Sequence, residues 1–169
     1  MLDGIATRSA GLSALHAFVP AMGKRYENGR NYDHGPGQHS AVSVLSPYIC
    51  RRLLTEDEVV GAALTAHGPD DARIFVEEVI WRGYFKGGLE RRPQVWDSYV
   101  EGLNVDLVSL KRDRRLRRDV ELAETGQTGL DYFDTWALEL VDTGYLHTHA
   151  RMRFASTWIL HLGLALRLV

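Results

Sequence analysis

After residue 46, apolar residues recur at helical spacing along most of the chain, and start and stop signals separate this stretch into individual helices. Ser46-Pro47 predicts a helix start, because a serine side chain can accept a bond from a free backbone N–H and proline at the first helical position withholds no needed donor. Thr55-Glu56-Asp57-Glu58 predicts a second start, with acidic residues at the positive end of the helix. This second helix is expected to end near His67-Gly68-Pro69.

The strongest helical pattern runs from Asp70 to about Lys86, and Gly87-Gly88 is expected to end it. Its apolar residues surround much of the helix, which predicts that the helix is largely buried. These residues are Ile74, Phe75, Ile80, Trp81, Tyr84 and Phe85.

The first 40 residues are dominated by turn signals. A short helix is predicted through Leu12 to Phe18 and closed by Pro20, while glycines and polar residues crowd Gly23 to Ser40. Residues 1–24 are therefore the least determined part of the pattern.

The second half of the chain is predicted to hold two helices, Leu130 to Asp142 and His147 to Leu164, with Gly144 between them. Residues 89–110 suggest loops with at most a short helix, and Thr125 to Thr128 suggests a turn. Strand-like alternation is nowhere sustained, so the predicted class is all-α. A length of 169 residues favours one helical domain over residues 1–169.

Composition narrows the environment of the protein. A net charge of −2 gives no global reason to expect a nucleic acid or an anionic membrane as partner. The single cysteine, Cys50, excludes an intrachain disulfide. The apolar run Trp158 to Leu166 is too short to span a bilayer, and Met1 to Leu15 lacks the apolar core of a signal peptide. We expect a cytoplasmic protein without a membrane partner.

The densest charge run is Lys111 to Arg118, within a charged segment that extends to Glu124. A helical arrangement would put Arg114 and Arg118 on one face, where they could contact DNA phosphates without sequence preference. The interspersed aspartates also fit a plain solvated helix face, and both interpretations stay open.

Two histidines, His147 and His149, flank Thr148. On a helix they would point about 200° apart, so we expect them not to share a metal ion. The sequence predicts no metal site.

Three blocks, in order, resemble the flavin-binding helical domain of photolyases and cryptochromes, and they span nearly the whole chain after residue 24. Tyr26 with Arg30, followed by Ser43-Val44-Leu45-Ser46-Pro47-Tyr48, is similar to the family's tyrosine and its Ser-Pro-Tyr phosphate loop. The stretch from Phe75 to Phe85 resembles the family's Glu-Leu-Ile-Trp-Arg-Glu-Phe-Tyr helix. The third block is Thr128-Gly129, Asp134 and Thr143-Gly144-Tyr145-Leu146-His147-Thr148-His149-Ala150-Arg151-Met152, similar to a Thr-Gly-aromatic-x-His-Asn-x-x-Arg-Met signature.

The resemblance implies a multi-helical FAD-binding domain, incomplete at its C-terminal side. The residues matched to the cofactor site are Tyr26, Arg30, Ser43, Val44, Leu45, Ser46, Glu78, Arg82, Thr148 and Arg151. Ser43, Ser46 and the amides opening the Pro47 helix would offer donors and positive potential to a pyrophosphate, although Ser46 can instead simply cap its helix.

Three charged residues of this set could act either on the flavin or within the protein. Glu78 and Arg82 are four residues apart on one helix, so they share one face and can form an ion pair, while the resemblance places both over the flavin pocket. Arg151 would hydrogen-bond flavin heteroatoms, or it would cap the aspartates of a neighbouring helix.

Several positions depart from the family pattern. Thr148 stands where the family has asparagine, and Arg153 and Thr157 put polar groups into a helix that the family buries. Leu164-Ala165-Leu166 replaces a Leu-Pro-Trp, and Val169 is expected to precede the family's Asp-x-Asp flavin contacts. We expect the four tryptophans to be core residues rather than electron relays: Trp81, Trp96, Trp136 and Trp158.

The leading hypothesis is an FAD-binding domain fragment or reduced homologue of a DNA photolyase or cryptochrome. For intact relatives the resemblance implies light-driven DNA repair or photoreception, and any activity here would be that of a deoxyribodipyrimidine photolyase-like lyase. The alternative is a noncatalytic helical module that has lost the flavin and serves in oligomerisation or in interaction with another protein, with exposed apolar helix faces as the candidate surface for a homo-oligomer.

Overall fold

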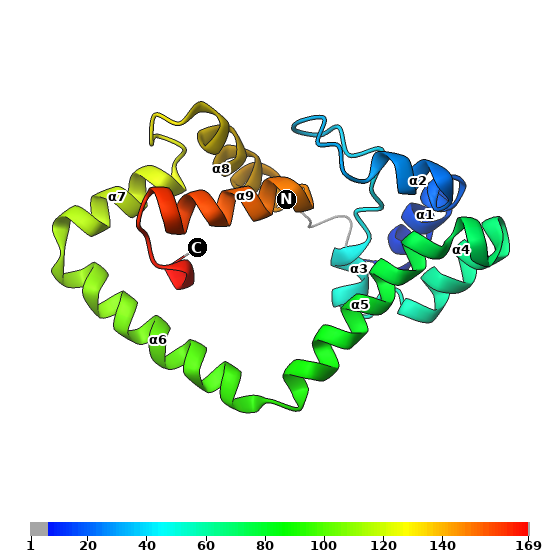
Figure 1. Ribbon diagram of the computed structural model, residues 1–169, viewed down its shortest axis with the longest axis horizontal. Helices are drawn as coiled ribbons and strands as arrows, with labels where there is room; N and C mark the ends of the chain where they lie inside the picture. Colours follow the sequence, from blue (N-terminus) through cyan, green and yellow to red (C-terminus); the bar gives the residue numbers. More distant parts are fainter. Residues whose placement is uncertain (1–6, 169) are drawn as a thin grey trace. The chain divides into compact units, whose positions relative to one another are not determined.

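The structure is a computed structural model that describes residues 7–168, and every regular element in that range is helical (Figure 1). The predicted all-α class is therefore confirmed. Residues 1–6 and Val169 lie outside this range. The prediction that Met1 to Leu15 is not a signal peptide therefore falls partly outside the described residues. The chain divides into two compact units, Met1–Gly88 and Leu89–Val169.

Local capping chemistry sets the helix boundaries in the first unit. Its elements are α1 (Arg8–Phe18), η1 (Val19–Ala21), α2 (Lys24–Gly29), α3 (Ser46–Cys50), α4 (Glu56–Asp71) and α5 (Arg73–Glu90). The Thr7 side chain accepts a bond from the Ala10 amide and starts α1 earlier than the predicted Leu12. Thr55 and Glu58 form a reciprocal capping box at the predicted start of α4. Gly68, with φ of 72°, interrupts α4 where the break was predicted.

A compact apolar core holds the first unit together. It is built from Leu15, Met22, Leu45, Ile49, Leu54, Val59, Ala63, Ala72 and Phe75. Leu45 is only 1% exposed and directly precedes α3, so it anchors the loop between α2 and α3 in this core. The hydrophobic effect therefore fixes one end of the loop that the sequence assigned to phosphate binding.

The helix predicted from Asp70 to about Lys86 corresponds to α5, and the prediction that it is largely buried was wrong. On α5 only Phe75 is buried, whereas Ile80, Trp81, Tyr84 and Phe85 are all more than half exposed. The helix also continues through Gly87-Gly88 to Glu90, since a glycine inside a helix costs only about 1 kcal/mol. Apolar periodicity identified the helix but not which of its faces has a neighbour.

The second unit contains a long helix that the sequence pattern did not predict. Residues 89–110 were expected to be mostly loop, yet α6 (Pro93–Arg112) is helical over 20 residues. Pro93 occupies the first turn, where its missing N–H costs nothing, and the C-terminal turn carries Lys111 and Arg112 at the negative end of the helix. None of the side chains on α6 is fully buried, which explains the weak apolar signal.

The other elements of the second unit follow the predicted order. They are α7 (Arg114–Glu124), α8 (Asp131–Thr143), α9 (Thr148–Ser156), the π-helical turn η2 (Thr157–His161) and η3 (Leu166–Leu168). Gly144 adopts the left-handed conformation, with φ of 69°, and ends α8 as predicted. Asp134 holds the turn before α8 by accepting bonds from Thr128 and Gly129.

Aromatic stacking dominates the core of the second unit. Phe133 and Phe154 lie parallel with ring centroids 4.4 Å apart, and Trp158 lies 6.1 Å from Phe154. The remaining buried members are Val120, Ala123, Ala137, Leu146 and Leu164. The π-helical turn η2 follows α9 directly and carries Trp158, whose indole N–H donates to the Ala165 carbonyl.

Across residues 7–168, none of the helices is both long and apolar enough to cross a membrane.

Candidate functional site

The loop between α2 and α3 carries an unusual backbone conformation. Val44 has φ of 48°, a left-handed value that is rare for a β-branched residue. The next residue, Leu45, is in the right-handed helical region and is buried. A left-handed residue joined to a right-handed one turns successive amide groups toward one concave side, which is an arrangement that binds anions.

The amides of this turn have few internal partners. The Leu45 amide donates a long bond of 3.5 Å to the Ser43 hydroxyl. Among residues 7–168, the amides of Val44 and Ser46 donate no bond. The side chain of Val44 is about one-third exposed, so the turn is accessible to solvent.

Ser46 does not have the capping role considered for it. The helix α3 begins at Ser46 as predicted, but its N-cap is Leu45 and no side chain caps it. Because α3 has only five residues, its dipole is small, and the positive character of this loop rests on its amides.

Tyr26 and Arg30 meet Glu78 in the first unit. The Arg30 guanidinium donates to the Glu78 carboxylate, joining the end of α2 to α5. Burial raises the pKa of Tyr26, and the charge of Glu78 raises it further. The Tyr26 ring stands edge-on to Phe75 with centroids 5.1 Å apart, which fixes the ring against the core.

The end of α2 lies close to the loop. A Cβ atom on Gly29 would come within 3.0 Å of the Ala41 Cβ, so glycine permits this close approach. Arg30 follows Gly29 directly, so the residue that pairs with Glu78 also lies where this loop begins.

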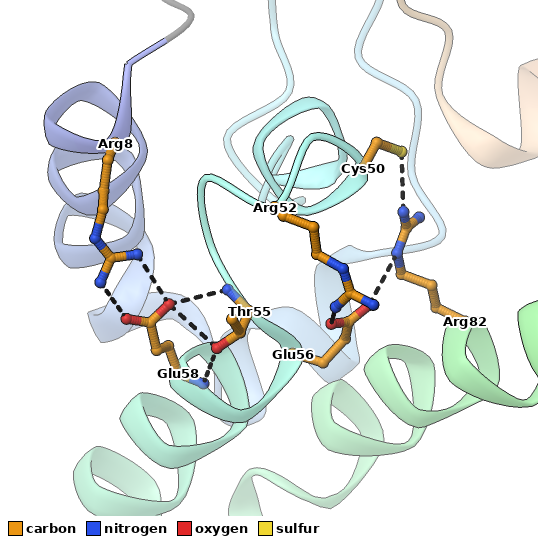
Figure 2. A network of polar contacts seen from close by, with 7 residues as sticks. All are labelled: Arg8, Cys50, Arg52, Thr55, Glu56, Glu58 and Arg82. Atoms are coloured by element: carbon orange, nitrogen blue, oxygen red, sulfur yellow. Dashed lines mark hydrogen bonds and ion pairs between the residues drawn. The ribbon is translucent and has the colours of Figure 1, made fainter.

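The ion pair that spacing allows between Glu78 and Arg82 does not form. Glu78 binds Arg30, while Arg82 turns toward the junction of α3 and α4 (Figure 2). Its Nη2 donates to the Cys50 sulfur over 2.9 Å, and its Nε lies 3.5 Å from a Glu56 carboxylate oxygen. Partners on neighbouring elements outcompete the residue one turn away, because pairs along a helix contribute only about 0.5 kcal/mol.

This second cluster ties three elements together. Glu56 also accepts from Arg52 over 2.7 Å, and Arg82 spans from α5 to the last residue of α3. Hydrogen bonding with its own backbone amide lowers the pKa of Glu56, with the neighbouring cations adding to the effect. The cluster therefore holds α3, and through it the Val44 turn, against α5.

A related network at the start of α4 was not anticipated. Arg8, on α1, donates to both carboxylate oxygens of Glu58, which also closes the Thr55 capping box (Figure 2). The bond from Arg8, aided by the backbone N–H of Thr55, lowers the pKa of Glu58 to about 2. The Thr55-x-x-Glu58 spacing signals the capping box, but no sequence spacing could have indicated Arg8.

Thr148 and Arg151, the other two residues matched to the cofactor site, belong to the second unit. Thr148 is the exposed first residue of α9. The Arg151 guanidinium donates to the Leu146 carbonyl over 3.1 Å, so it binds the segment entering its own helix rather than the aspartates of a neighbour. Arg153 is exposed and does not enter the core.

The expected directions of His147 and His149 were wrong. His147 lies before α9 as its N-cap and accepts a bond from the His149 amide, and the two rings stack with centroids 5.5 Å apart. The 200° estimate assumed that both residues were helical. Residues 7–168 contain no cluster of three metal-ligating side chains.

The tryptophans divide into two groups. Trp158 is 1% exposed and Trp136 is half-buried and packs against the second core, as expected of core residues. Trp81 and Trp96 are 52% and 66% exposed, so the expectation was wrong for them. Trp81 contacts Tyr84 and Phe85 on its own helix, and Trp96 stacks on Tyr99, so the aromatic partners seen for both within residues 7–168 are local.

A family model described as the FAD binding domain of DNA photolyase matches residues 75–168. A deoxyribodipyrimidine photo-lyase of Thermus thermophilus is 29% identical over 153 residues, covering 90% of this chain and 34% of the relative. One from Agrobacterium fabrum is 27% identical over 154 residues, covering 89% and 30%. The chain thus spans about a third of the length of these relatives.

A solved structure shows the same fold. A bacterial class III photolyase from Agrobacterium tumefaciens aligns with a TM-score of 0.73 and 24% identity. The alignment covers 95% of this chain and 32% of that chain. The likeness therefore extends over both units of the present chain.

Proposed function

This chain belongs to the family of the FAD-binding domain of DNA photolyase, and we propose that it binds FAD, with the Ser43–Ser46 turn as the pyrophosphate subsite. The family membership supports the cofactor. The strained Val44 turn is the observation that carries the subsite.

The turn offers what a pyrophosphate requires. Strained backbone persists only where the surroundings enforce it, and such strain clusters at ligand sites. Here the buried Leu45 side chain enforces it and leaves the amides of Val44 and Ser46 without a partner among residues 7–168. The Ser43 and Ser46 hydroxyls add donors, since hydrogen bonds to a charged acceptor contribute about 1.5–3 kcal/mol each.

Charged side chains would support the subsite from α2 and α5. Arg30, at the start of the loop, is bound to Glu78 and so ties the end of α2 to α5. Arg82 positions α3 through Cys50 and Glu56. The phosphate subsite therefore draws on the first unit alone.

The family resemblance also assigns Thr148 and Arg151, in the second unit, to flavin contacts, and the chemistry of the two side chains suits that role. The guanidinium of Arg151 can donate to flavin heteroatoms, while the Thr148 hydroxyl can donate and accept. Bound FAD would supply redox chemistry at the isoalloxazine ring. The photo-lyase reaction named for the relatives is not part of the proposal, because the chain spans only about a third of their length.

The proposal is tested by the visible spectrum of the purified, desalted protein, followed by calorimetric titration with FAD. We expect flavin absorbance or reconstitution, and FAD at about 100-fold its Kd should raise the free energy of unfolding by about 2.7 kcal/mol. A folded protein that is colourless and shows neither heat nor stabilisation at high FAD would refute the proposal.

A double serine variant tests whether the phosphates bind at this turn. Ser43→Ala combined with Ser46→Ala removes two hydroxyl donors and should weaken FAD binding at least about 10-fold. The matched control is Ser13→Ala with Ser98→Ala, two exposed helical serines far in sequence from the turn. Equal affinities of the two double variants would place the phosphates elsewhere.

A second candidate function, self-association of a helical module, is favoured by the exposed face of α5. Ile80, Trp81, Tyr84 and Phe85 expose more than half of their surface, and a hollow of about 350 Å³ lies beside Ile80, Trp81 and Tyr84. Exposed apolar patches of this kind mark interaction surfaces.

Light scattering coupled to size-exclusion chromatography tests this candidate. We expect a wild-type oligomer and a monomeric Tyr84→Glu, Phe85→Glu variant, because buried carboxylates are costly. A wild-type monomer at high protein concentration would contradict it.

A further inference from the structure

Residues 163–168, which we call the strap, run from η2 back to α6 within the second unit (Figure 1). Gly163 starts the turn with φ of 66°, a value that glycine adopts without strain. The Leu164 amide donates to the Trp158 carbonyl, and the Trp158 indole N–H donates to the Ala165 carbonyl, each over 3.0 Å. One end of the strap is therefore fixed to the aromatic core.

An ion pair, which we call the catch, fastens the other end of the strap to the middle of α6. Arg167, in η3, donates to the Asp106 carboxylate over 2.8 Å. Its guanidinium lies against α6 at Gly102, where an added Cβ atom would overlap it. Gly102 and Asp106 are one helical turn apart, so the glycine leaves the space through which the arginine reaches its partner.

The place of α6 in the second unit depends on this contact. Within residues 7–168, α6 packs mainly against η3 and against α7, the helix that follows it in the chain. Leu110 near the end of α6 and Leu168 in η3 both pack against the second core. In contrast, α8 packs directly against α7 and α9. The middle of α6 can therefore separate from the core while α8 and α9 remain packed.

The catch is weaker than the core that it borders. The side chains of Arg167 and Asp106 keep 41% and 18% of their surface exposed. Ion pairs in contact with solvent contribute little to stability and weaken as salt rises. None of the three residues of η3 is buried, so apolar burial adds little at this end of the strap. Opening of the strap therefore requires less free energy than unfolding of the aromatic core.

We propose that the strap is a salt-sensitive conformational switch. When the catch is closed, the strap holds α6 against the second core. When the catch opens, the middle of α6 separates, while α8 and α9 stay folded. Neither Asp106 nor Arg167 belongs to the proposed FAD site, and the switch does not depend on flavin binding.

Native-state hydrogen exchange of the full chain, followed by NMR, tests the switch. The salt concentration is raised from about 0.1 M to about 1 M, which shortens the screening length from about 10 Å to about 3 Å. The amides of residues 103–110 should exchange about 3-fold faster at the higher salt, because the catch is then open more often. The amides of α8 should keep their rates, since the packing of α8 does not involve the strap.

Two variants remove the catch in different ways. Asp106→Asn removes a charge, whereas Gly102→Ala adds a Cβ atom that displaces the guanidinium while strengthening the helix. Both should abolish the salt response of residues 103–110, and adding Arg167→Gln to Asp106→Asn should change nothing further. The matched control is Asn104→Ala, at an exposed position of the same helix, which also strengthens the helix and should keep the full salt response.

The wild-type protein alone can refute the switch. Exchange in α6 that does not respond to salt, or a response of equal size in α6 and α8, would overturn the proposal without any variant. A response that survives in both Asp106→Asn and Gly102→Ala would also overturn it, because salt would then act on something other than the catch.

Discussion

The left-handed conformation of Val44 makes a prediction that ordinary helix or loop positions would not share. An L-residue in this region costs about 1–2 kcal/mol relative to the right-handed region, whereas glycine adopts it freely. Replacing Val44 by alanine keeps the backbone cost, and replacing it by glycine removes it. Both variants lose the valine side chain, so comparing them with each other isolates the backbone contribution.

The expected difference is worked from two opposing effects. Relief of the left-handed conformation favours glycine by about 1–2 kcal/mol, while the greater freedom of glycine in the unfolded chain opposes it by about 0.4–1 kcal/mol. Val44→Gly should therefore be more stable than Val44→Ala by about 1 kcal/mol. For a chain of 169 residues this corresponds to a rise in Tm of about 3 °C.

The control is the same pair of substitutions at Val108, a 46% exposed residue within α6. In a helix interior alanine is favoured over glycine by about 1 kcal/mol, so the sign of the difference should reverse. Urea denaturation followed by circular dichroism measures both differences. If Val44→Ala is as stable as Val44→Gly, the turn is not left-handed at this residue.

The same pair of variants bears on cofactor binding. Because glycine loosens the unbound loop, Val44→Gly should bind FAD more weakly than Val44→Ala although it is the more stable protein. Tighter binding by Val44→Gly would contradict the view that the strained turn is preorganised for phosphate.

The remaining predictions concern stability. The pKa of Glu58 lies near 2 because of Arg8, so its stabilising effect is present above its usual value of 4.5 and is lost as the pH falls through about 2. Glu58→Gln should lower the Tm at pH 7, with the difference from wild type vanishing toward pH 2; a difference independent of pH would count against the network. Phe133→Ala, in the second core, should lower the free energy of unfolding in urea by about 4 kcal/mol, against less than about 0.5 kcal/mol for Val141→Ala, which is 70% exposed. Gly144→Ala should cost about 1 kcal/mol in the same assay, since φ is 69° there, and a neutral effect would argue against the left-handed C-cap.

Short-range backbone chemistry made much of the secondary structure predictable. The capping box at Thr55, the break at Gly68 and the glycine C-cap at Gly144 all depend on interactions within about four residues, so their residue types and spacing suffice. The family resemblance was readable for a similar reason, since its motifs are short and contiguous. The helix within residues 89–110 was not predicted, because it buries no side chain completely and so gives a weak apolar pattern.

Side-chain partners depended on residues distant in sequence. Arg82 was free to pair with Glu78 by spacing, but the fold brings Cys50, 32 residues away, to its guanidinium. Glu78 likewise meets Arg30, 48 residues away. Spacing along a helix shows which pairs are geometrically allowed, whereas the packing of other elements sets which partner is nearest.

The burial of side chains and the directions in which they point could not be predicted from sequence patterns either. The apolar residues of α5 predicted a buried helix, yet burial requires a neighbouring surface, and only Phe75 has one on all sides. A single residue decided the histidine geometry: His147 precedes α9 instead of entering it, so its ring stacks on His149. Composition and local spacing thus specified the helical class, the caps and the family, because these depend on nearby atoms. Exposure, ion-pair choice and the left-handed turn at Val44 came from tertiary packing, because they depend on which distant surfaces the folded chain brings together.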